Sequence, residues 1–197
     1  IEHGVHRIAG LSADRGRAAS HHPVGAPALL VVHHSLAPVS TLTPLLSRAG
    51  RQGFVVGDMS DVDNFSPIDS IDVPDAPLYL LYDLDRGDAM ANWSPDEALP
   101  AITDTGRTPL TLTEGVHWLL QRPDVLERGT CFMTIGSRLR KPSGALDART
   151  PAVWISNGTG RDGSANRDAP KVGWCWAGNR HTWLGFGSAR RRLTVDG

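Results

Sequence analysis

Short apolar runs, separated by glycine and proline, limit this chain more than any other feature of its sequence. The longest run of apolar side chains, Ala28–Val32, has five residues, and 21 glycines and 14 prolines punctuate the 197-residue chain. A membrane-spanning helix needs about 20 consecutive apolar residues, so the sequence predicts no membrane segment. Hydrophobic residues still make up 40% of the chain, which is enough for a core and excludes disorder of the whole chain. We therefore expect short helices and strands around one core.

Two capping boxes mark the starts of helices. Ser94–Glu97 has serine at the N-cap, proline at the first helical position and glutamate at the third. Thr111–Glu114 repeats this spacing with threonine at the N-cap. Because proline lacks the backbone N–H that a helix interior needs, we expect Pro100 to stop the first helix early and Pro123 to end the second.

The first two strands are predicted to flank a short helix. Ala28–Val32 and Phe54–Val56 are apolar runs typical of buried strands, and Leu78–Tyr82 is a third such run. Between the first two, Ser40 is a candidate N-cap, and Gly50 stands where the residue after a helix is often glycine. This order predicts a strand–helix–strand crossover with the two strands parallel.

The last third of the chain is predicted to be β structure. Its expected strands are Cys131–Ile135, Ala152–Ile155 and Lys171–Ala177, and Thr182–Phe186 is expected to return as the hairpin partner of the last one. The predicted fold class is therefore α+β, with a mixed sheet of about six strands and about three short helices. The C-terminal third of this fold should be mainly antiparallel.

Three segments are expected along the chain. Residues 1–27, with a short helical face followed by a stretch rich in Ala, Arg, His, Gly and Pro, are predicted to be an N-terminal arm or linker, a fragment of a longer N-terminus. Residues 28–188 are predicted to form a single α+β domain. Residues 189–197 contain the run Arg190–Arg192 and are predicted to be a polar basic tail.

The charge balance argues against a general nucleic-acid binder. The formal net charge is −1 and the pI is about 6.8, whereas proteins that neutralise phosphate backbones are usually basic. The two cysteines, Cys131 and Cys175, are too few for a disulfide framework. Two reduced thiols are favoured, and a single bridge stays open. Because no secretion-signal pattern is present, a cytoplasmic location is expected.

One string of the sequence is especially specific: Gly173–Gly185 has the sequence GWCWAGNRHTWLG. Four further strings accompany it, namely Phe54–Met59, Pro77–Tyr82 with Asp85–Asp88, Asn92–Pro100 and Gly106–Thr111. In these strings the chain resembles, across residues 28–188, a family of uncharacterised actinobacterial proteins that is classed as a domain of unknown function. The resemblance implies a soluble bacterial protein from a genome rich in G and C. It implies no activity, cofactor or catalytic residue.

The segment from Trp174 to Trp183 concentrates residue types that bind ligands. Its three indole faces can stack on a base, a sugar or a quaternary ammonium, and an arginine can clamp a carboxylate or phosphate. The competing interpretation is that these tryptophans are core residues, because large aromatic side chains are mostly buried for packing. The candidate ligand-binding residues, which include one arginine from a neighbouring predicted strand, are Trp174, Trp176, Arg180, His181, Trp183 and Arg138.

Metal and nucleophile chemistry is not predicted. The loops Asp58–Asp63 and Asp83–Asp88 are rich in oxygen ligands, but they depart from the EF-hand pattern, and aspartate favours turns. The eight histidines lack the tight ligand pairs of zinc sites, so we predict no metal and no cofactor. The sequence contains no G-x-S-x-G and no P-loop, and the glycines of Gly158–Gly163 do not open a helix after a strand.

Three functions are consistent with these features. The first is a module that binds a small ligand or a protein, with a homo-oligomer as one form of partner, through the Trp/Arg/His segment. The second is an enzyme, a hydrolase or transferase, in which His181 is the general base and Arg180 or Arg138 is the oxyanion or phosphate clamp. It requires an acid such as Asp58 or Asp85 within hydrogen-bond reach of His181. The third is association with RNA or the ribosome, which requires arginines gathered on one face and not paired with aspartate.

Overall fold

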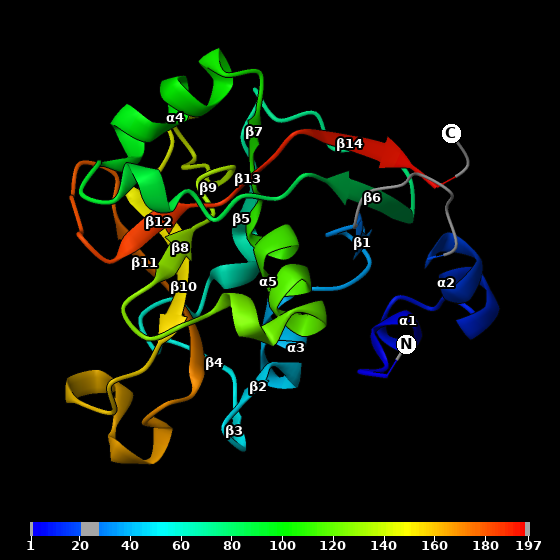
Figure 1. Ribbon diagram of the computed structural model, residues 1–197, viewed down its shortest axis with the longest axis horizontal. Coiled ribbons are helices and arrows are strands. Elements are labelled where there is room, and N and C mark those ends of the chain that lie inside the picture. Colours follow the sequence, from blue (N-terminus) through cyan, green and yellow to red (C-terminus); the bar gives the residue numbers. More distant parts are fainter. Residues whose placement is uncertain (1, 21–27, 196–197) are drawn as a thin grey trace.

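The computed structural model describes residues 2–20 and 28–195, apart from the side chains of Ser20 and Arg161, and it has an α+β fold (Figure 1). In these ranges the α-helices are α1 (Val5–Ile8), α2 (Ala13–Ser20), α3 (Val39–Leu42), α4 (Pro95–Asp104) and α5 (Leu112–Gln121). The strands are β1 (Ala28–Val32), β2 (Ser47–Arg48), β3 (Arg51–Gln52), β4 (Phe54–Val55), β5 (Phe65–Pro67), β6 (Leu78–Tyr82), β7 (Thr108–Pro109), β8 (Cys131–Met133), β9 (Ser137–Leu139), β10 (Arg149–Ile155), β11 (Pro170–Trp176), β12 (Leu184–Phe186), β13 (Ser188–Ala189) and β14 (Arg191–Thr194). The predicted fold class is confirmed.

The larger sheet has five strands in the order β12–β8–β10–β11–β4. β10 is antiparallel to both β8 and β11, and its hairpin with β11 pairs Arg149 with Trp176 at one end and Ile155 with Pro170 at the other. The outer strands β12 and β4 run parallel to their neighbours, so the sheet is mixed. The long β10–β11 hairpin makes the C-terminal third mainly antiparallel, as predicted.

The smaller sheet, β1–β6–β14, is antiparallel throughout. α5 contacts β1 in this sheet and β10 in the larger one, so this helix lies at the centre of the core (Figure 1). The residues from Leu112 to Leu120 are all buried. Gly115 lets the helix approach the larger sheet, because a Cβ at this position would lie 2.5 Å from Thr134 Cγ2. α1 and α2 lie beside the smaller sheet, at one edge of the molecule (Figure 1).

Both predicted capping boxes are present. Ser94 Oγ accepts the Glu97 N–H at 3.4 Å, and the Glu97 carboxylate accepts the Ser94 N–H at 2.9 Å. The expected stop at Pro100 is wrong, because α4 continues to Asp104 with this proline inside it. Pro100 is exposed, and the buried side chains of Ala98 and Ile102 anchor the helix on both sides of it. Packing of this face outweighs the single backbone bond that the proline removes.

The predicted parallel crossover between the first two strands is wrong. β1 pairs with β6 in the smaller sheet, and β4 pairs with β11 in the larger one. The helix between them, α3, has only four residues, which is too short to carry a chain back to a parallel neighbour. Ala49 and Gly50, both with positive φ, form the two-residue turn of the β2–β3 hairpin, so Gly50 does not terminate a helix.

The predicted hairpin between β11 and residues 182–186 is also wrong. β12 pairs in parallel with β8, on the far side of β10 from β11. Backbone bonds hold the connecting segment, residues 177–183. Among them, the Asn92 N–H donates to the His181 carbonyl at 2.9 Å, and the Cys131 N–H donates to the Trp183 carbonyl at 3.1 Å. The chain therefore crosses the end of the sheet instead of folding back beside β11.

The expected polar tail contains a paired strand. Residues Arg191–Thr194 form β14 against β6, and Arg192 forms a buried ion pair with Glu114 of α5. Within the predicted N-terminal arm, the short helical face at Val5 and Ile8 is α1, and α2 follows it. The separation of residues 28–188 from these flanking segments stays a prediction.

Two further expectations concern the membrane and the thiols. No helix in residues 2–20 and 28–195 is long and apolar enough to span a membrane. Cys131 and Cys175 are free thiols, which closes the alternative of a bridge between them.

Candidate ligand-binding site

A cavity of about 250 Å³ lies along β11, next to the segment that follows β4. We call it the tryptophan cavity; its walls include Trp154, Asp162, Lys171, Trp174, Trp176 and His181. These residues come from β10, β11, the loop between them and the segment that crosses the end of the sheet. The structure therefore brings together three of the predicted site residues, Trp174, Trp176 and His181.

Two tryptophans on one face of β11 form an aromatic wall. The rings of Trp174 and Trp176 meet edge to face, with their centres 4.5 Å apart. Trp176 is 48% exposed, so this residue is not a core side chain. Trp174 is half-buried, and its indole Nε1 is buried without a hydrogen-bond partner among the described residues. This wall offers an open apolar face and an unused donor beside it.

An arginine–aspartate pair contacts the aromatic wall. The Arg149 guanidinium lies 6.0 Å from the centre of the Trp174 ring, in cation–π contact. Its two terminal nitrogens donate to the carboxylate of Asp61 at 3.0 and 2.7 Å. The hydrogen bond to this carboxylate raises the pKa of Arg149, and the same contact lowers the pKa of Asp61. The Arg149 guanidinium thus connects the Trp174 ring to Asp61.

Trp154 also lines the cavity, from the opposite face of the β10–β11 hairpin to Trp174 and Trp176, and it was not among the predicted site residues. Lys171 Nζ lies 4.6 Å from the centre of the Trp154 ring and 2.6 Å from Asp162 Oδ2. Both charged side chains are 11% exposed, so this ion pair is largely shielded from water. Gly173 makes room for the indole, because a Cβ there would lie 2.6 Å from a ring carbon of Trp154.

His181 lines the cavity and has a ring nitrogen without a described hydrogen-bond partner. Its Nε2 is buried and has no hydrogen-bond partner among the described residues. Burial lowers the pKa of His181, so the ring is neutral at pH 7. Asp58 lines the same cavity, but it is not a partner of Nε2. The Asp85 carboxylate accepts the Gly87 N–H at 2.8 Å.

The other three predicted site residues lie outside the tryptophan cavity. Arg180 pairs with Glu97 and donates to the Asn92 carbonyl at 3.2 Å, so it joins the start of α4 to the crossing segment. Arg138, on β9, donates from Nε to the Asp147 carbonyl at 2.9 Å. Trp183 is 37% exposed and lines a neighbouring cavity that also contains Trp154. No arginine clamp therefore forms from Arg138 and Arg180.

The partners that sequence reasoning missed come from cross-strand register. Trp154 lies opposite Lys171 in the β10–β11 hairpin, which places their side chains on one face of the sheet. Asp162 belongs to the loop that connects these two strands. A hairpin alignment of Ala152–Ile155 with Lys171–Ala177 would have predicted the Trp154–Lys171 contact. The sequence alone gave no reason to choose this register over its neighbours.

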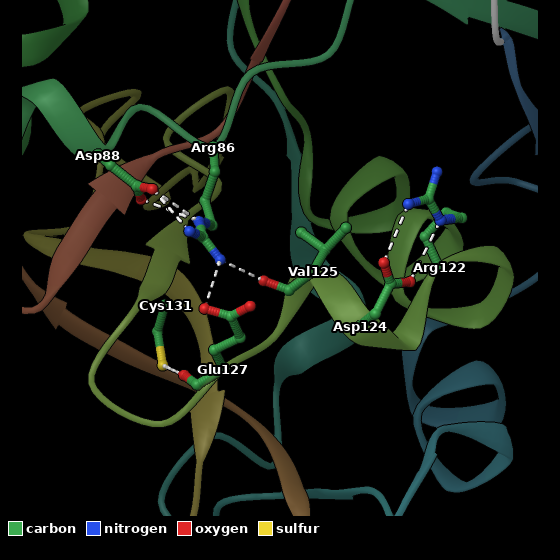
Figure 2. A network of polar contacts seen from close by, with 7 residues as sticks. All are labelled: Arg86, Asp88, Arg122, Asp124, Val125, Glu127 and Cys131. Atoms are coloured by element: carbon green, nitrogen blue, oxygen red, sulfur yellow. Dashed lines mark hydrogen bonds and ion pairs between the residues drawn. The ribbon is translucent and has the colours of Figure 1, made fainter.

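Neither thiol has the character of a catalytic nucleophile. Burial raises the pKa of Cys175, which lines the tryptophan cavity, to about 11. Burial also raises the pKa of Cys131, whose Sγ donates to the Glu127 carbonyl at 3.5 Å (Figure 2). Both side chains are thus protonated thiols at neutral pH. Among the described residues no group of three or more His, Cys, Asp or Glu side chains could hold a metal ion.

Arg86 is at the centre of the polar network next to Cys131, and its contacts are structural. It donates to the Asp88 carboxylate from Nε at 2.9 Å and to the Val125 carbonyl from Nη1 at 2.7 Å (Figure 2). The carboxylate of Glu127 lies farther from this guanidinium, with 3.9 Å between Arg86 Nη1 and Glu127 Oε2. The arginine therefore joins the loop after β6 to the turn after α5, and none of its contacts reaches the tryptophan cavity.

The fold and the site define an α+β protein with a partly open aromatic cavity and no recognised catalytic arrangement among its described residues. Comparison with protein families matches residues 1–195 to a family of unknown function, DUF5701, and the chain belongs to this family. The match extends beyond both ends of the resemblance over residues 28–188. No curated protein and no solved structure matches the chain.

Proposed function

We propose that this protein is a binding module that holds a small uncharged ring compound in the tryptophan cavity. The observation that carries the proposal is a cavity lined by the exposed Trp176 and by two residues that each have a buried polar atom without a described partner, Trp174 (Nε1) and His181 (Nε2). Buried polar atoms are normally hydrogen-bonded, so a group without a partner in a cavity is a natural contact for a ligand.

The chemistry of the walls limits the ligand. Tryptophan rings favour a flat or apolar ring face, and the Trp174 N–H requires an acceptor at the edge of that ring. Lys171 and Asp162 neutralise each other, so this ion pair favours neither an anion nor a cation. A sugar or a neutral heteroaromatic base has both the ring face and the acceptors.

A protein partner is the second candidate. Trp93, Trp176 and Trp183 are 40%, 48% and 37% exposed, and aromatic residues are enriched at the cores of interfaces. A homo-oligomer that covers these rings would satisfy the same observation. A dependence of molecular mass on protein concentration, lost in Trp93→Ala and Trp183→Ala, would favour this candidate.

The two alternative functions have less support. The enzyme hypothesis requires an acid such as Asp58 or Asp85 on His181, and the Asp85 carboxylate accepts the Gly87 N–H instead. The RNA hypothesis requires uncommitted arginines, yet Arg140 pairs with Asp69 and Arg192 with Glu114. The cytoplasmic location and the actinobacterial origin are further parts of our proposal, and they rest on the sequence and its resemblance alone.

Isothermal titration calorimetry tests the proposed function. Methyl α-glucoside and adenosine are the two probes, because each represents one of the two ring chemistries. We expect saturable binding of one probe, weakened about tenfold or more in Trp176→Ala, since stacking on one aromatic ring is worth about 1–3 kcal/mol. Trp93→Ala is the matched control, because Trp93 is equally exposed but lies outside the tryptophan cavity. Failure of both probes, or equal loss in both variants, would overturn the proposal.

A further inference from the structure

A second cavity, of about 190 Å³, lies between the N-terminal helices and the smaller sheet. We call it the His117 cavity. α1 and α2 close one side of it, and β1, β6 and α5 form the other side. Most of its wall is apolar, with side chains from both sides: Val5, Leu11, Leu30, Val32, Leu78 and Leu120.

His117 is a buried polar residue in this apolar wall. Its side chain belongs to α5, the residue is 3% exposed, and its Nε2 has no hydrogen-bond partner among the described residues. Burial lowers the pKa of His117 to about 4, so the ring is neutral at pH 7. A neutral imidazole has one donor nitrogen and one acceptor nitrogen. In either tautomer, Nε2 therefore lacks a hydrogen-bond partner here.

Three other polar residues line this cavity, namely His3, His6 and Gln121. Gln121 is fully engaged: its amide nitrogen donates to the Leu30 carbonyl at 2.7 Å, and its amide oxygen accepts the Leu30 N–H at 3.3 Å. His6 resembles His117, because its Nδ1 is buried without a partner among the described residues. Two unused imidazole nitrogens, one from each side, therefore belong to residues that line one apolar cavity.

We propose that the His117 cavity binds a small neutral alcohol or phenol, with the hydroxyl on His117 Nε2 and the carbon ring against the leucine and valine side chains. The size fits, because an apolar cavity of roughly 150 Å³ is known to hold benzene. A hydroxyl both donates and accepts, so it pairs with either tautomer of the imidazole. His6 Nδ1 is a second contact for the same hydroxyl. A charged ligand would lose its hydration without gaining an opposite charge from this wall.

The first test compares two ligands on the wild-type protein. Phenol and toluene have nearly the same shape, and only phenol carries the hydroxyl. The readout is the histidine ring signals in NMR spectra of protein labelled at histidine, which report the site as well as the affinity. We expect phenol to shift the His117 signal saturably and to bind at least tenfold more tightly than toluene. Absence of a saturable shift at His117, or equal affinity for both ligands, would overturn the proposal.

The second test uses a variant that keeps an aromatic ring but removes its nitrogens. In His117→Phe the preference for phenol over toluene should disappear, because the nitrogen is gone while the ring remains. His33→Phe is the control, since His33 bonds Ser35 outside this cavity and its loss should leave the preference intact. Retention of the preference in His117→Phe would contradict the proposal. If this variant fails to fold, the wild-type comparison still decides, and neither test depends on the tryptophan cavity.

Discussion

Arg192 Nε lies 2.6 Å from Glu114 Oε1, in an ion pair whose side chains are 4% and 0% exposed. The guanidinium also donates to Thr108 Oγ1 and to the Pro109 carbonyl, and the Tyr79 hydroxyl donates to the same glutamate at 2.9 Å. Burial raises the pKa of Tyr79, so its hydroxyl stays protonated and keeps this bond. The last strand of the fold is therefore fixed to the central helix by a buried charge.

Removing one member of this ion pair should destabilise the protein strongly. Arg192→Met leaves the Glu114 carboxylate buried without its counter-charge, and such a loss typically costs about 3–5 kcal/mol. Arg191→Met is the matched control, because Arg191 is exposed and its guanidinium lies 5.1 Å from the centre of the Tyr82 ring, a contact worth about 1 kcal/mol or less. Urea denaturation measures both. Similar losses in the two variants would show that the Glu114 contact carries no special weight.

His117 should make the folded state less stable in acid. Its pKa is about 4 in the folded protein and 6.5 for an ordinary histidine. Between these values the unfolded chain binds more protons than the folded one, so stability rises with pH in this window and falls as the pH is lowered. The loss between pH 7.5 and pH 4.5 should be about 2–3 kcal/mol.

The variant His117→Phe isolates this contribution. His34 and His181 also have pKa values lowered by burial, so they add to the acid sensitivity of both proteins. The difference between wild type and variant in the free energy of unfolding, followed from pH 7.5 to 4.5, reports His117 alone. Parallel pH profiles would contradict a buried neutral histidine at this position.

Gly115 should resist the substitution that usually stabilises a helix. Alanine in a helix interior is about 1 kcal/mol better than glycine, but here its Cβ would lie 2.5 Å from Thr134 Cγ2, in a fully buried side chain. We expect Gly115→Ala to lower the free energy of unfolding by about 1–3 kcal/mol. Gly178→Ala meets nothing within 4 Å and should be close to neutral. Stabilisation by Gly115→Ala would mean that α5 lies farther from β8.

Cys175 should react slowly in the folded protein. A pKa of about 11, against 9.0 for the ordinary thiol, lowers the thiolate fraction at pH 8 by about 100-fold. The measurement is alkylation by iodoacetamide in Cys131→Ala, with and without urea, so that only Cys175 reports. Equal rates in the two conditions would contradict the buried, protonated thiol next to the tryptophan cavity.

Local sequence predicted the helices better than it predicted the strand partners. The capping box at Ser94 and its counterpart at Thr111 are complete within four residues, so the sequence around them was enough. The partner of Leu184 is Cys131, more than 50 residues earlier, and no local pattern indicates this pairing. The β12–β8 and β1–β6 pairings therefore had to come from the structure, and the hairpin and crossover predictions failed there.

The candidate site was predicted in part for the same reason. Trp174, Trp176 and His181 lie within eight residues of one another, and the concentration of indole and imidazole rings was visible in the sequence. The position of Trp154 depends on the β10–β11 register, which places this residue beside Lys171. Arg180 was predicted as an anion clamp because of its neighbours in sequence. Its actual partner, Glu97, lies 83 residues away.

The central claim is that a ligand binds in the tryptophan cavity against the aromatic wall of Trp174 and Trp176. It is tested most directly by ¹⁹F NMR of protein labelled with 5-fluorotryptophan. The six indole signals are assigned with single Trp→Phe variants, and the ring compound that binds in calorimetry is then titrated. Our account predicts saturable shifts of the Trp174 and Trp176 signals, with the buried Trp118 in α5 unchanged. Binding that leaves both the Trp174 and Trp176 signals in place would contradict it.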